Sequence, residues 1–174
     1  MYPKPYIDYL VYFHTNRDYF ECHEVLEEHW KVADPRHRNV LWVGLIQVAV
    51  SLYHHRRSNY VGAERTMKKA ISILDAHHQE LFQIGLQPID LISILNKHLR
   101  LIQASKPYQS LNMPIVDEHL VQQCHAHPLA QTFGWLTPSN LQDEHLIHRH
   151  KLRDRTAIIA ERAKKLRKSR ASRS

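Results

Sequence analysis

Apolar residues recur at helical spacing through most of this chain, and the alternating runs typical of strands are few. Pro5 can open a first helix, because the first helical position needs no amide hydrogen. Asp18 and Glu21 form a capping box, which predicts that a second helix begins at Tyr19 and ends near residues 34–35. The first part of the chain is therefore predicted to be helical.

A third helix is predicted over residues 38–57, and its apolar residues cover every side. That pattern is typical of a helix in the centre of a bundle. Ser58 or Asn59 can cap the following helix, which runs toward Gly85, a residue suited to the position after a helix end. Pro88 can open another helix. Together these signals predict about five core helices.

The second half of the chain is less regular. Prolines break residues 106–139 into extended pieces and one short helix near residues 117–125, and a long polar helix follows from about residues 137–138. We therefore predict an all-α multi-helix bundle in three parts. These are a helical core domain over 1–105, an irregular connection over 106–139, and a basic C-terminal helix and tail over 140–174.

A chain of 174 residues suits one domain, and its two cysteines, Cys22 and Cys124, form no spacing pattern. Disulfides are rare in reducing compartments, so we expect a cytoplasmic protein. The N-terminal residues lack the apolar core of a signal peptide. The longest uncharged run, residues 40–53, is shorter than the about 20 residues of a membrane span, so no transmembrane segment is expected.

The net charge of +7 is concentrated at the C-terminus. Lys151–Ser174 contains ten lysines and arginines against two acidic residues, a net +8, whereas the rest of the chain carries −1. Such a segment attracts phosphate groups, so nucleic acid is a candidate partner. The segment also carries a narrow apolar stripe, which could dock on the domain or on a second subunit of a homo-oligomer: Leu152, Ile159, Ala163 and Leu166.

Ionisable groups interrupt an apolar helix face within residues 19–30. At roughly 100° per residue, His23 and Glu27 lie one turn apart on a face that otherwise carries large apolar side chains: Tyr19, Phe20, Leu26 and Trp30. Burial of an ionisable group is costly unless a partner satisfies it. We therefore expect a buried polar centre in which His23 and Glu27 find partners.

The third predicted helix carries a matching polar stripe: Gly44, Gln47, Ser51 and His54. Consecutive helices joined by a short loop tend to pack antiparallel, so we expect this stripe to face His23 and Glu27. Asn59 could close the cluster at the start of the next helix.

Several blocks of this region resemble the pattern of domain of unknown function family 309. They are Phe20-x-x-His23-Glu24-x-x-Glu27-x-x-Trp30, Gly44-Leu45-Ile46-Gln47-x-Ala49, His54, and Asn59-x-x-Gly62-Ala63. The resemblance covers roughly residues 6–80. It implies an all-helical cytosolic fold without an established activity, and it places seven polar or aromatic residues together without assigning them a role: His23, Glu24, Glu27, Trp30, Gln47, His54 and Asn59.

This polar centre has three interpretations: a buried structural network, a metal-free pocket, or a divalent-metal site. In a catalytic pocket, His23, Glu27 and His54 would act, with the His23/Glu27 pair in acid–base work of a hydrolytic kind. A small polar or anionic ligand would contact a second group of residues: Glu24, Trp30, Gln47, Ser51 and Asn59. In a metal site, His23, Glu27 and His54 would be the ligands, because imidazole and carboxylate bind zinc.

A second class of function is a non-enzymatic interaction protein, whose polar centre is structural and whose basic C-terminal helix contacts nucleic acid or a protein. The sequence leaves open whether the protein is an enzyme. Two further groups supply zinc-type ligands at short spacing, but their spacing matches no standard finger and ordinary surface histidines are the favoured interpretation: Cys124-His125-x-His127 and His145-x-x-His148-x-His150.

Overall fold

A computed structural model describes residues 1–33 and 39–152 of the chain, and it shows an all-α protein. Five longer helices form the bundle: α1 (Lys4–His14), α2 (Tyr19–Val32), α3 (Val40–Arg56), α4 (Tyr60–Asp75) and α6 (Pro88–Gln103). Five shorter ones complete the described part: α5 (His78–Gln83), α7 (Glu118–His125), α8 (Pro128–Phe133), α9 (Glu144–Ile147) and α10 (Arg149–Leu152). The prediction of an all-α bundle is confirmed.

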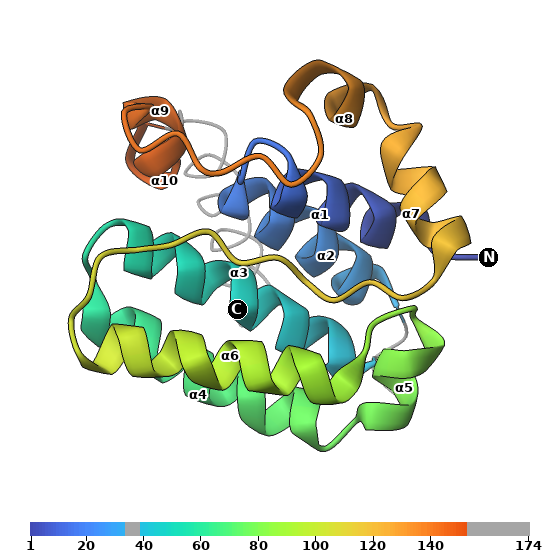
Figure 1. Cartoon of the computed structure of the whole chain (residues 1–174), viewed down its shortest axis with the longest axis horizontal. Coiled ribbons are helices and arrows are strands. Elements are labelled where there is room, and N and C mark those ends of the chain that lie inside the picture. Colours follow the sequence, from blue (N-terminus) through green and yellow to red (C-terminus); the bar gives the residue numbers. More distant parts are fainter. Residues whose placement is uncertain (34–38, 153–174) are drawn as a thin grey trace, which may run out of the picture.

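Helix α3 lies at the centre of the bundle, as its apolar surround predicts (Figure 1). It packs against α2 on one side and α4 on the other, while α1 covers α2 and α6 covers α4. Helix α4 approaches so closely that a Cβ atom at Gly44 would lie 2.6 Å from Leu74 Cδ2. Figure 1 shows the connection between α6 and α7 running along the bundle beside α3.

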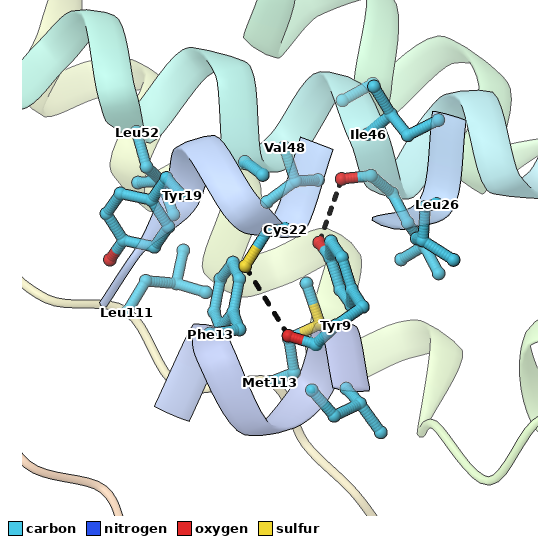
Figure 2. Packing of buried hydrophobic residues seen from close by; sticks show 14 of the residues in the cluster. Tyr9, Phe13, Tyr19, Cys22, Leu26, Ile46, Val48, Leu52, Leu111 and Met113 are labelled. Atoms are coloured by element: carbon cyan, nitrogen blue, oxygen red, sulfur yellow. Dashed lines mark hydrogen bonds between the residues drawn. The ribbon is translucent and has the colours of Figure 1, made fainter. Parts of the chain in front are cut away.

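The core between α1, α2 and α3 is aromatic and aliphatic (Figure 2). The buried Tyr9 hydroxyl donates a 2.8 Å hydrogen bond to the carbonyl of Leu45, which ties α1 to α3. The thiol of Cys22 contacts the carbonyl of Tyr9 at 3.5 Å, so α2 is tied to α1 in the same place. The Tyr9 hydroxyl and the Cys22 thiol thus each find an acceptor inside an otherwise apolar core.

Capping residues begin the helices where the sequence predicts. Asp18 accepts the amide of Glu21 at 3.1 Å, and Asn59 accepts the amide of Gly62 at 3.0 Å. The capping box is only half made, because the Glu21 carboxylate binds Arg149 instead of returning to the Asp18 amide. A distant contact therefore replaces a local one.

Two predictions of a long helix are wrong within the described residues, because shorter helices replace it in each case. The helix expected to reach Gly85 divides into α4 and α5, because the His77 amide bonds to the carbonyl of Leu74 and closes a turn there. The polar helix expected from residues 137–138 appears only as α9 and α10, which His148 separates. Within residues 106–139, α7 agrees with the short helix expected there, whereas α8 was not expected.

None of the helices in the part of the chain that the structure describes is long and apolar enough to span a membrane.

Candidate functional site

Three neighbouring side chains on α2 form a His/Glu group. The imidazole of His23 lies between two carboxylates, with Nδ1 3.2 Å from Glu24 Oε1 and Nε2 3.5 Å from Glu27 Oε2. Lys31 Nζ lies 3.0 Å from the other oxygen of Glu27. One ligand atom each from His23, Glu24 and Glu27 lies within 4.8 Å of the other two, so this group could hold a metal ion.

The group is half-exposed rather than buried. The side chains of His23, Glu24 and Glu27 are 28%, 33% and 34% exposed. The reason lies in the rotation of α2, because its fully buried residues are Tyr19, Cys22 and Leu26. The face that carries His23 and Glu27 is turned by about one residue from that core face, roughly 100°. The expectation that the pair is buried is therefore wrong.

The polar stripe of α3 is divided between two surroundings. Ser51 is buried and its hydroxyl donates a 2.7 Å hydrogen bond to the carbonyl of Ala63 in α4. Gly44 also faces α4, through Leu74. The structure thus sets these two residues against α4 instead of against His23 and Glu27.

His54 lies at the junction of α3 and α4. Its Nδ1 is 3.0 Å from the side-chain nitrogen Nδ2 of Asn59, the residue that caps α4. Burial lowers the pKa of His54, and the nearby cations Arg57 and Arg65 lower it further. Among the described residues, the possible metal-binding group of α2 does not include His54. Gln47 and Trp30 are half-buried, and Trp30 packs against the core.

A buried network of arginines, which the sequence analysis missed, lies where the α1–α2 turn meets residues 111–149. Arg17 is 1% exposed and donates to the carbonyls of Thr137 and Leu111 at 2.7 and 2.6 Å, and to Asn112 Oδ1 at 2.7 Å. Its backbone adopts the left-handed conformation, with φ 57°. A guanidinium with a partner at each of its three nitrogens therefore fixes this strained turn.

Arg56, at the end of α3, extends the same network. One of its guanidinium nitrogens donates to the carbonyl of Arg17 at 2.8 Å and to Ser139 Oγ at 2.9 Å. The other donates to the carbonyl of Leu146 at 3.2 Å. The guanidinium carbon also lies 4.9 Å from the centre of the Tyr19 ring. Arg56 thus holds the C-terminal segment against the bundle.

Three buried histidines belong to the core rather than to the α2 group. His14 Nδ1 contacts the carbonyl of Leu10 at 2.8 Å, and its Nε2 accepts the Met113 amide at 2.9 Å, which requires a neutral ring. Burial lowers the pKa of His14 to about 3. His55 and His98 contact each other at 3.1 Å, and burial followed by the charge of His55 lowers the pKa of His98 to about 4.

A cleft of about 670 Å³ opens beside this network. Residues of the α1–α2 turn, the first turn of α2 and the segment before α10 line it. Five of the lining residues are charged or titratable: Asp18, Glu21, Asp143, His145 and Arg149. Arg149 donates to both Asp18 and Glu21. Burial raises the pKa of Asp18, while the Glu21 amide and Arg149 oppose that rise.

The two other zinc-type groups do not converge within the described residues. Cys124 is buried, and burial raises the pKa of its thiol to about 12. His127 Nδ1 instead accepts the Leu129 amide at 3.2 Å. His150 Nδ1 lies 2.6 Å from the Tyr53 hydroxyl. Residues 153–174, on which most of the predicted nucleic-acid contact falls, lie outside the described residues.

These features define the class of protein: an all-α bundle with a half-exposed His/Glu group and a buried His/Arg network. The family described as domain of unknown function (DUF309) matches residues 6–66, and the chain belongs to this family. Among curated proteins, the "Uncharacterized protein YpuF" of Bacillus subtilis (strain 168) is 46% identical over 173 residues, which cover 99% of each chain. No solved structure matches the chain.

Proposed function

We propose that His23, Glu24 and Glu27 bind a divalent metal ion on the half-exposed face of α2. The observation that carries this proposal is the convergence of one imidazole nitrogen and two carboxylate oxygens within 4.8 Å. Ligand atoms that share one zinc-sized ion lie about 3 Å apart, since each lies about 2 Å from the metal. Small side-chain rotations would therefore bring the three atoms into one coordination sphere.

The ligand types indicate which ions suit the site. Imidazole favours zinc and other transition metals, whereas carboxylate oxygens also accept manganese. Three protein ligands leave at least one position open, as in catalytic zinc sites. An open position on a half-exposed helix face could take water or a small polar or anionic ligand, which agrees with the ligand class expected from the sequence.

Two alternatives receive less support from the geometry. A general base needs one free imidazole nitrogen, but both nitrogens of His23 face a carboxylate. A purely structural role is also disfavoured, because half-exposed ion pairs contribute little to stability, typically about 0–1 kcal/mol. Half-exposure instead leaves a path by which an ion can enter. His54 stays outside this proposal because it pairs with Asn59.

The test is calorimetric titration of the full, untagged chain with Zn²⁺ and Mn²⁺. We expect His23→Ala and Glu27→Gln each to abolish one binding site or to weaken it at least about tenfold, a change of about 1.4 kcal/mol. His148→Ala is the matched control, because His148 also pairs with a glutamate four residues away, Glu144, at 3.3 Å. Equal affinity and stoichiometry for the unmodified chain and His23→Ala would overturn the proposal.

A further inference from the structure

The cleft beside the α1–α2 turn has a lining that excludes the His/Glu group of α2. Its volume of about 670 Å³ falls within the range of small-molecule pockets. The lining comes from two regions far apart in sequence, residues 15–21 and residues 133–149. His23, Glu24 and Glu27 do not line it, so a ligand in this cleft would bind independently of any metal ion on α2.

Buried arginines hold both walls of the cleft in place. Arg17 joins the α1–α2 turn to the carbonyl of Thr137, a lining residue. Arg56 joins the same turn, through the carbonyl of Arg17, to Ser139 and to the carbonyl of Leu146. The cleft is therefore preformed, which lowers the entropic cost of binding a ligand. The strained backbone at Arg17 also lies beside it, in the kind of position where functional sites store strain.

The lining carries more negative than positive charge. Three carboxylates, those of Asp18, Glu21 and Asp143, line the cleft beside a single guanidinium, that of Arg149, and the imidazole of His145 is the fifth titratable group of the lining. Arg149 donates to Asp18 Oδ2 and to Glu21 Oε1. Asp143 Oδ1 accepts the Leu146 amide at 3.0 Å. Glu21 Oε2 and Asp143 Oδ2 remain as acceptors that an incoming cation could use.

Arg149 shows how the carboxylates of this cleft hold a cationic group. Its guanidinium is bound between two carboxylates at the edge of the same cleft, where partial burial strengthens charge-assisted hydrogen bonds. A negatively charged ligand would be poorly accommodated in the cleft, since it would meet three carboxylates. Apolar side chains form part of the remaining wall, among them Phe133, Pro138 and Leu146, and polar side chains form the rest.

We propose that this cleft binds a small organic cation: an ammonium or guanidinium group held by Glu21 and Asp143, joined to an apolar part that packs on Phe133 and Leu146. The charged end supplies specificity and the apolar end supplies burial, the usual division in a small-molecule site. An aromatic or alkyl amine of modest size has this chemistry.

The test compares three compounds of similar shape on the full chain by NMR titration: phenethylamine, its neutral analogue 2-phenylethanol, and the anion phenylacetate. We expect phenethylamine to shift the resonances of cleft residues and to bind at least tenfold more tightly than the other two. Its affinity should fall as salt is added, because the charges are partly exposed. Equal binding of the neutral analogue, or no binding of phenethylamine, would overturn the proposal.

Two variants locate the cation and preserve the fold. Asp143→Asn removes a charge but keeps a good helix cap for α9, and Glu21→Gln keeps an acceptor for Arg149. Each should weaken phenethylamine binding about tenfold. Glu144→Gln is the control, because this neighbouring side chain is 74% exposed and does not line the cleft, and it should change the affinity less than twofold. Unchanged binding in both cleft variants would refute the site, whereas His23→Ala should leave binding intact.

Discussion

Acid should destabilise this protein through two buried histidines. His14 is fully buried, and this burial lowers its pKa from 6.5 to about 3, while both nitrogens of the neutral ring have hydrogen-bond partners. His98 is also buried, and its pKa falls to about 4. In the unfolded chain each imidazole would titrate near 6.5. Below that pH the unfolded state binds protons that the folded state does not, so stability is full above pH 6.5 and falls as the pH drops toward 3–4.

The magnitude follows from these pKa values. At pH 5 an unfolded imidazole is almost fully protonated, while His14 and His98 remain mostly neutral in the folded protein. Each of these two histidines therefore lowers the free energy of unfolding at pH 5 by about 2 kcal/mol relative to pH 8, and together they lower it by about 4 kcal/mol. That sum is a large part of the roughly 5–15 kcal/mol that stabilises a typical domain.

Urea unfolding at pH 8, 6 and 5, followed by circular dichroism, measures this dependence. His14→Gln can still donate to Leu10 and accept from Met113 but cannot titrate, so it should remove about 2 kcal/mol of the loss between pH 8 and 5. His78→Gln is the control, since His78 is exposed. A loss below about 1 kcal/mol in the unmodified protein, or the same loss in His14→Gln, would refute the reasoning.

Three substitutions test other parts of the structure by the same unfolding measurement. Arg17→Met leaves the buried carbonyl of Leu111 and the partly buried carbonyl of Thr137 without these donors and should cost about 3–5 kcal/mol, against less than about 0.5 kcal/mol for Arg100→Met on the exposed side of α6. Gly44→Ala should cost about 1–2 kcal/mol, because the clash with Leu74 outweighs the gain in helix propensity. His23→Ala should cost less than about 1 kcal/mol, and a loss above about 2 kcal/mol would place His23 in a structural network.

Local signals predicted most of the helical bundle. Pro5, Asp18, Asn59 and Pro88 act within one helical turn, so each helix start follows from neighbouring residues and agrees with the structure. The breaks between α4 and α5 and between α9 and α10 carry no comparable proline or glycine. The segment before α10 is instead positioned by Arg56, Arg149 and other side chains that bind residues far away in sequence. Periodicity cannot anticipate such contacts.

The candidate site on α2 was predicted in its composition but not in its exposure. Spacing places His23 and Glu27 together on any helix, and their contact at 3.5 Å agrees. Which face turns inward depends on a rotation of only one residue, and packing on α1 and α3 decides it in favour of Cys22 and Leu26. The cleft could not be predicted at all, because Asp18 and Asp143 are brought together only by the completed fold.

Helix α2 connects the two proposed sites. Its first turn supplies Phe20 and Glu21 to the cleft, and its next turn supplies His23 to the possible metal group, with the rings of Phe20 and His23 6.4 Å apart. The adjoining core face of the helix is fixed by Cys22 and Leu26. A helix held this firmly offers no second packing arrangement through which occupancy of one site could alter the other. We therefore expect the metal affinity and the amine affinity to be independent, so that saturating zinc leaves the affinity for phenethylamine unchanged within twofold.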